Sequence, residues 1–210
     1  MTTEHFAEPA EPGRLTAASC DQSGPRAAPG GPDQSSLRPL AADPACAMAH
    51  GDLPPEVGAR TLVVVFVSPV ASYLLHFAGD LGFRTVLVEP DPARRAGAPR
   101  ADLTLADPDK SFVDADADVV ATDHDRPELG DTLQQVLQTP ARWVGVIGSL
   151  RHTAPHVAAL RDQGLDDTTI ARVHRPVGLN IGSHTPAEIA VATLAGLIAD
   201  RNGRPGGFRF

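Results

Sequence analysis

Residues 61–67 read TLVVVFV and residues 85–89 read TVLVE. Each run is rich in β-branched residues and does not alternate with polar ones, which is typical of strands buried on both faces of a parallel sheet. Between the runs, Ser68 and Pro69 suit the N-cap and first position of a helix, and Gly82 suits its end. This spacing predicts a right-handed βαβ unit.

The following residues continue the alternation of strands and helices. Together they predict an α/β fold over residues 60–202, a Rossmann-like three-layer sandwich with a mainly parallel sheet. In such sheets ligands bind beyond the carboxyl ends of the strands. The strand patterns cover 101–106, 118–122 and 142–148, and the helix patterns cover 129–137, 154–163, 167–173 and 185–201.

The two ends of the chain have a different composition. Residues 1–59 are rich in Pro, Gly, Ala and Ser without an apolar period, which predicts a disordered N-terminal arm, and residues 203–210 are expected to be a flexible tail. The formal net charge of −8 gives no reason to expect nucleic acid or an anionic membrane as a partner. The start of the chain lacks the pattern of a secretory signal, and no apolar run approaches the ~20 residues of a membrane span, so a cytoplasmic location is predicted.

Cysteine and lysine usage excludes several chemistries. Cys20 and Cys46 both lie in the predicted arm, so no disulfide is expected in the folded part and no zinc motif is present. Lys110 is the sole lysine and lies in a polar stretch, which excludes a P-loop.

The first strand-to-helix turn decides which nucleotide the fold could hold. A dinucleotide-binding domain has GxGxxG there, because glycine lets the backbone approach the pyrophosphate. Residues 66–71 read FVSPVA, without glycine, so NAD(P) is not expected to bind. Ser68 and the helix N-terminus could still hold an anion, or Ser68 could only cap the helix.

Polar residues follow two other predicted strands. Glu89 occupies the position where an acidic residue binds a ribose in dinucleotide-binding folds. Asp123, His124 and Asp125 directly follow the strand 118–122 and indicate either a group that binds a metal or transfers a proton, or a polar turn. His152 and His156 are four residues apart but lack a third ligand, so no metal site is predicted.

Glycine and hydroxyl residues mark a second candidate region. Residues 145–149 read GVIGS and place Gly148 and Ser149 at the end of a strand. Residues 175–188 read RPVGLNIGSHTPAE, which is either a structured connector or a ligand loop. We expect this loop to return to the sheet edge near Gly148 and Ser149, because the helix that follows must bury one face against the sheet. That face is expected to contain Ile189, Ala192, Leu194, Ala195 and Ile198.

Taken together, GVIGS and PVGLNIGSHTPAEIA (residues 176–190) resemble the C-terminal Rossmann domain of the XdhC/CoxI family. The resemblance extends back through LGFRTVLVEPDPAR and VVATDHD and covers about residues 61–202. It implies a protein that binds molybdenum cofactor and serves in the maturation of xanthine dehydrogenase-type molybdenum hydroxylases. A cofactor chaperone is implied rather than a turnover enzyme, so no catalytic residue is assigned.

The resemblance also implies partners and a binding surface. The partner is the apoenzyme of a molybdenum hydroxylase, and a cysteine desulfurase and a second copy of the chain are further candidates. Two rival hypotheses are an NAD(P)-dependent oxidoreductase and a degenerate Rossmann module that serves only in protein interaction. The residues expected at the cofactor are Ser68, Glu89, Asp123, His124, Gly148, Ser149, Arg151, Asn180, Gly182, Ser183 and Thr185.

Overall fold

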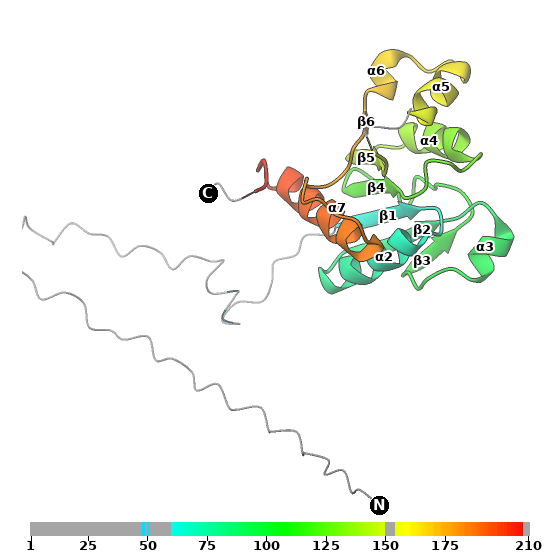
Figure 1. Cartoon of the computed structure of the whole chain (residues 1–210). Helices are drawn as coiled ribbons and strands as arrows, with labels where there is room; N and C mark the ends of the chain where they lie inside the picture. The colour runs from blue at the N-terminus through cyan, green and yellow to red at the C-terminus, as the bar shows by residue number, and fades with distance from the viewer. Residues whose placement is uncertain (1–47, 49, 51–59, 150–153, 208–210) are drawn as a thin grey trace, which may run out of the picture. The chain divides into compact units, whose positions relative to one another are not determined.

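The computed structural model describes residues 48, 50, 60–149 and 154–207 (Figure 1). The chain divides into two units, residues 1–54 and 55–210, and the second carries the Rossmann-like domain. The predicted disordered arm lies almost wholly outside the described residues, so that expectation stays a prediction, as does the flexibility of the tail. No helix of the described part is long and apolar enough to cross a bilayer.

The prediction of an α/β fold with a parallel sheet is confirmed. Within the described residues six parallel strands pair in the order β3-β2-β1-β4-β5-β6, the order of a dinucleotide-binding Rossmann sheet. The strands are β1 (Thr61–Val65), β2 (Arg84–Val88), β3 (Leu103–Leu105), β4 (Ala117–Ala121), β5 (Trp143–Val146) and β6 (Val173–His174). The helices are α2 (Pro69–Asp80), α3 (Pro92–Ala96), α4 (Leu129–Leu137), α5 (Pro155–Asp162), α6 (Asp167–Ile170) and α7 (Pro186–Arg201).

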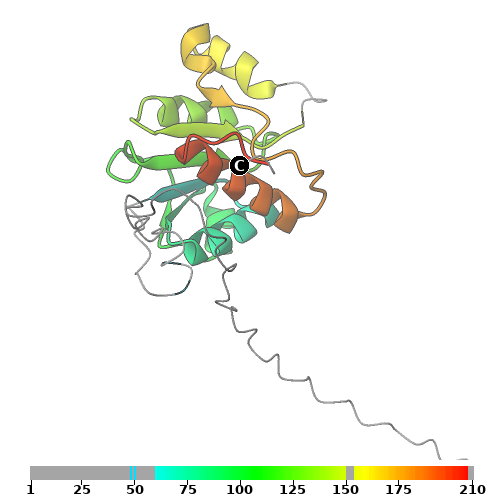
Figure 2. The ribbon, with the colours of Figure 1, turned by 90° about the vertical axis from the view of Figure 1, so that its left-hand side faces the viewer.

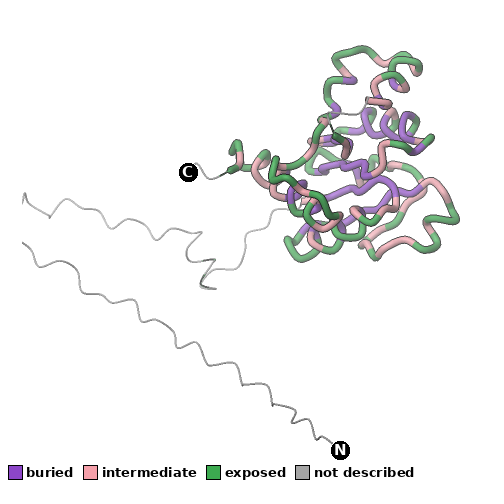
Figure 3. The backbone as a smooth tube through the Cα atoms, viewed as in Figure 1, coloured by how far each residue is buried: buried purple, intermediate pink, exposed green. Residues whose placement is uncertain are grey.

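Helices cover both faces of the sheet, which makes three layers (Figure 2). On one face Leu62 and Val64 of β1 lie in a core with residues of α2 and α7, among them Leu74 and Leu197. On the other face Val63 of β1 lies in a core with residues of α4 and α5. The central strands are accordingly buried along their length, whereas the helices are buried on one side (Figure 3).

The structure contains one strand and one short helix that the sequence did not predict, and it corrects the expected core face of α7. The pattern over 167–173 predicts only a helix, but that helix ends at Ile170 and Val173 begins the short strand β6. The short helix α3, capped by the side chain of Asp91, was not expected. In α7 the fully packed residues include Ala190 and Leu197, whereas Ile198 is half-buried and lines a surface groove with residues of α2.

Candidate functional site

The candidate residues gather at the carboxyl edge of the sheet in two groups. Residues that follow β1, β2 and β4 form the first group, which surrounds the point where the strand order reverses. The end of β5 and the loop between β6 and α7 form the second. Arg151 lies outside the described residues, so its role stays a prediction.

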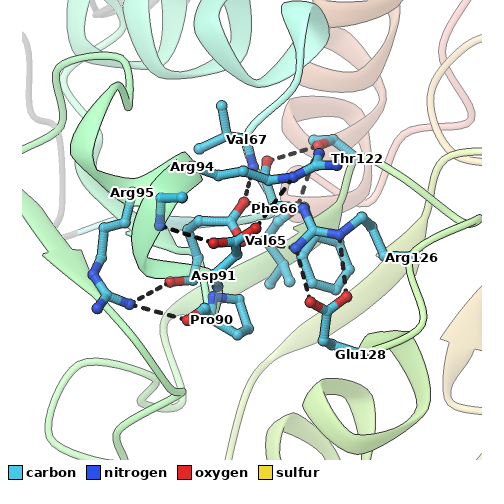
Figure 4. A network of polar contacts seen from close by, with 12 residues as sticks. Val65, Phe66, Val67, Pro90, Asp91, Arg94, Arg95, Thr122, Arg126 and Glu128 are labelled. Carbon is cyan, nitrogen blue, oxygen red and sulfur yellow. Dashed lines mark hydrogen bonds and ion pairs between the residues drawn. The ribbon is translucent and has the colours of Figure 1, made fainter.

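Glu89 is the centre of the first group. Its side chain is fully buried, and its carboxylate accepts four hydrogen bonds. The backbone amides of Val67 and Asp91 donate over 2.8 and 3.0 Å, and the guanidinium of Arg126 donates to both oxygens over 3.1 and 2.9 Å (Figure 4). Glu89 therefore binds groups of its own chain at the position where related folds bind a ribose.

Arg126 is held from three sides, although sequence reasoning did not select it. Besides Glu89, its guanidinium donates to the carboxylate of Glu128 from Nε and Nη2, both over 3.1 Å. Its centre lies 4.7 Å from the centroid of the Phe66 ring, a cation–π contact. Hydrogen bonding to Glu89 raises the pKa of Arg126 above its usual value, so the guanidinium is charged.

The polar groups of the turn after β1 form hydrogen bonds within the chain. Phe66 has φ of 73°, a left-handed conformation that is rare outside glycine, in the place of the first glycine of a dinucleotide turn. The hydroxyl of Ser68 accepts from the amide of Ala71 over 3.0 Å, as an N-cap, and donates to the hydroxyl of Thr122 over 2.9 Å. Thr122 in turn donates to the carbonyl oxygen of Phe66 over 2.9 Å. The capping interpretation of Ser68 accounts for the hydrogen bond from Ala71, and the hydrogen bond to Thr122 links the turn to the end of β4.

We expect the pairing of Glu89 with Arg126 to make stability depend on pH. Burial raises the pKa of the Glu89 carboxyl, but hydrogen bonds from Arg126, Val67 and Asp91 outweigh it and hold the pKa below its ordinary 4.5. Because the folded pKa is the lower one, the stability that the ionised carboxylate adds is present above the unfolded pKa and is lost as the pH falls through the folded value.

Glu89→Gln should therefore cost about 2 kcal/mol at neutral pH, through weaker hydrogen bonds to the guanidinium. The difference from the unaltered protein should narrow as the pH falls below 4.5, when Glu89 also becomes protonated. Urea unfolding of both proteins over a pH series measures this. A difference of constant size from neutral to acid pH would contradict the assignment.

Asp123 and His124 form a turn beside this group. Oδ1 of Asp123 accepts from the amide of Asp125 over 3.0 Å, and Nε2 of His124 lies 3.6 Å from Oδ1 of Asp125. These contacts are those of a polar turn after β4. Among the described residues, no three His, Cys, Asp or Glu side chains are placed to hold a metal ion.

The second group lines a cavity of about 520 Å³. Its walls are residues 147–149 after β5, residues 176–183 of the loop, and Ile189 of α7. Gly148, Ser149, Asn180, Gly182 and Ser183 all belong to these walls, so the structure brings together residues about thirty positions apart in the sequence. The loop thus returns to the strand end where the sequence placed it.

Tight glycine packing fixes the course of this loop. Gly178 has φ of 82°, and a Cβ there would lie 2.8 Å from backbone atoms of Ala192 and Thr193 in α7. A Cβ on Gly196 of α7 would lie 2.8 Å from Cα of Gly178. The amide of Leu179 donates to the carbonyl oxygen of Ala192 over 2.9 Å. The loop is therefore anchored to α7 directly before its cavity-lining residues.

Arg175 contacts the residues that follow β5 beside this cavity, and its side chain lines a neighbouring cavity together with His156. Its Nη2 donates to the carbonyl oxygen of Ser149 over 3.1 Å, and its guanidinium lies where a side chain at Gly148 would be. His156 is buried close by, and burial followed by the charge of Arg175 lowers its pKa, so it is neutral at physiological pH. Sequence reasoning did not select Arg175, although it directly precedes the resembling motif.

Thr185 caps α7 and lies next to the cavity in sequence. Its hydroxyl accepts from the amide of Glu188 over 3.2 Å, while the Glu188 carboxylate accepts from the amides of His184 and Thr185 over 2.7 and 3.0 Å. These contacts form a capping box. The carboxylate of Glu188 thus already binds the N-terminus of α7.

The chain is similar to known proteins over its Rossmann-like domain. The family model of the XdhC Rossmann domain matches residues 62–197. The chain is 39% identical over 77 residues to the uncharacterised protein YqeB of Escherichia coli K12, covering 37% of this chain and 14% of that protein. It is 29% identical over 151 residues to a Bacillus subtilis 168 protein named as a probable xanthine dehydrogenase subunit, covering 67% of this chain and 42% of that protein.

A solved structure, described as a xanthine dehydrogenase from Bacillus halodurans, is similar with a TM-score of 0.55 and 25% identity. The match covers 70% of this chain and 44% of that one. The chain thus spans less than half the length of each of these relatives.

Proposed function

Because the chain belongs to the family of the XdhC Rossmann domain, we propose that it binds molybdenum cofactor as an accessory protein in the maturation of xanthine dehydrogenase-type molybdenum hydroxylases. The observation that carries the proposal is the cavity between the end of β5 and the loop of residues 176–183. The relative from Bacillus subtilis, with its xanthine dehydrogenase name, supports the choice of client.

The residues around the cavity fit such a ligand. Its volume of about 520 Å³ lies within the usual range for small-molecule sites. Hydroxyl and amide side chains of Ser149, Ser183 and Asn180 line it, and the phosphate of a pterin cofactor suits such donors. The guanidinium of Arg175 donates to the carbonyl oxygen of Ser149 next to them. When bound, the cofactor supplies the redox chemistry of the client enzyme, and these side chains hold and orient it.

The remaining functional assignments follow from this proposal. The protein is a cofactor chaperone rather than a turnover enzyme, and its partner is the apoenzyme of a molybdenum hydroxylase. A cysteine desulfurase and a second copy of the chain are further proposed partners, in the cytoplasm. Ser68, Glu89 and Thr185 are less suited to cofactor binding, because hydrogen bonds within the chain already engage their side chains.

Cofactor released from a molybdenum hydroxylase under anaerobic conditions is the probe for a binding test. The sole tryptophan, Trp143, reports binding by its fluorescence, since its ring lies against Gly145 of β5, which also faces Val177 of the loop. We expect Ser183→Leu to fill part of the cavity and weaken binding by about tenfold or more.

Ser111→Leu is the matched control, because Ser111 is exposed, lies in the connection between β3 and β4, and does not line the cavity. It should bind as the unaltered protein does. Failure of the unaltered protein to bind the cofactor would refute the proposed function, and equal binding by the two variants would refute the location of the site.

A further inference from the structure

We infer that Arg126 closes the nucleoside half of the Rossmann cleft, so that the domain excludes adenine dinucleotides despite the strand order of a dinucleotide-binding sheet. In that fold an acidic residue at the end of the second strand binds the ribose hydroxyls, and amides of the first turn approach the pyrophosphate. Glu89 follows β2 at that position, between the ends of β1 and β3. The inference does not rest on the proposed function.

Arg126 takes the place of a ribose on Glu89. It donates one hydrogen bond to each carboxylate oxygen of Glu89 (Figure 4). Each oxygen accepts a second hydrogen bond, Oε2 from the amide of Val67 and Oε1 from the amide of Asp91. The exposed fractions of the two side chains are 5% for Arg126 and 0% for Glu89. A ribose could reach the carboxylate only by breaking a buried ion pair, which is strongly unfavourable because it leaves a buried charge without its partner.

The first turn is closed to a pyrophosphate by the same arrangement. The amide of Val67 donates to Glu89 and that of Ala71 to Ser68, and Pro69 has no amide hydrogen to donate. The buried ring of Phe66 stands in the turn under the guanidinium of Arg126. The carboxylate of Glu89 and the amides of Val67 and Ala71 are therefore engaged within the chain.

Arg126 closes only the part of the carboxyl edge that lies around Glu89. Neither Phe66, Glu89 nor Arg126 is among the residues that line the cavity after β5. A ligand of that cavity does not compete with the Glu89–Arg126 pair, whereas an adenosine moiety at the end of β2 does. Arg126 is thus a specificity-determining residue: it selects against dinucleotides without contacting a ligand of the second group.

The test is calorimetric titration of the full chain with NAD⁺ and with ADP-ribose. The unaltered protein should show no binding at about 1 mM ligand. Arg126→Ala frees the carboxylate of Glu89 and a space beside Phe66, and should bring ADP-ribose affinity up by about tenfold or more. Arg95→Ala is the matched control, because Arg95 donates only to the backbone carbonyls of Glu89 and Pro90, and it should not gain binding.

A double variant guards against misfolding, which circular dichroism detects. Glu89→Gln combined with Arg126→Ala removes both buried charges and keeps an acceptor for a ribose hydroxyl at position 89. A gain of ADP-ribose binding in either folded variant supports the inference. Binding of NAD⁺ by the unaltered protein below about 1 mM, or no gain in any folded variant, overturns it. Molybdenum cofactor binding should be unchanged in both variants, which separates this test from that of the proposed function.

Discussion

Replacing Asp118 with alanine is expected to lower the free energy of unfolding by about 3–5 kcal/mol. The side chain of Asp118 lies on β4 and is fully buried. Its Oδ1 accepts from Nε of Arg142 and its Oδ2 from Nε of Arg201, both over 2.7 Å. Loss of the carboxylate leaves two partly buried guanidinium groups without their shared partner, and it removes the ion pair between β4 and Arg201 at the end of α7.

Chemical denaturation of the purified chain measures this effect. Asp116→Ala is the matched control, because the Asp116 side chain is exposed and only its backbone carbonyl bonds to Arg201. It should change stability by less than about 0.5 kcal/mol. If both variants lost similar amounts of free energy of unfolding, the loss in Asp118→Ala could not be assigned to its buried ion pairs, and the prediction would be wrong. The expected loss is a large part of the roughly 5–15 kcal/mol that a domain has in total.

The fold was predictable because its central strands are locally encoded. The run TLVVVFV has few conformations other than a buried strand, and Ser68-Pro69 and Gly82 mark the helix that follows. The predicted strand nevertheless ends at Val65, since Phe66 adopts φ of 73° that no local pattern indicates. Tertiary packing stabilises this conformation, with the Phe66 ring buried beneath Arg126.

Less could be predicted where residues depend on distant partners. Strand β6 has two residues and exists through its pairing with β5, so its own sequence does not distinguish it from a helix end. Helix α7 is apolar almost all round, and its 3.6-residue period does not decide whether Leu197 or Ile198 faces the sheet.

In the candidate site, too, locally encoded residues were predictable and residues with distant partners were not. Glu89, Gly148 and Ser149 were identified by their position after a strand, which sequence pattern alone provides. Arg126 was missed because its partner Glu89 is 37 residues away, and such a pair leaves no local periodicity. Position after β2 placed Glu89 among the residues expected at the cofactor, whereas its partners in the folded chain decide what it can bind.

Gly178→Val is expected to cost about 3 kcal/mol or more and to remove cofactor binding. Two effects combine: φ of 82° is strained for any residue with a Cβ, and that Cβ would lie 2.8 Å from the backbone of Ala192 and Thr193. The loop would have to lift from α7 and lose the hydrogen bond from the Leu179 amide to Ala192. Since the cavity is walled by residues 176–183, its shape would change with the loop.

Gly182→Ala separates the two effects. Gly182 also has a positive φ, 69°, but no atom lies within 4 Å of a Cβ built there. The substitution should therefore lower the free energy of unfolding only by the strain of the left-handed conformation, about 1–2 kcal/mol. The loop should stay packed on α7. Thermal unfolding and cofactor titration of both variants provide the comparison. Equal losses of stability and binding in the two would mean that contact with α7 does not set the shape of the cavity; retained binding in the glycine-to-valine variant would mean that the loop is no part of the site.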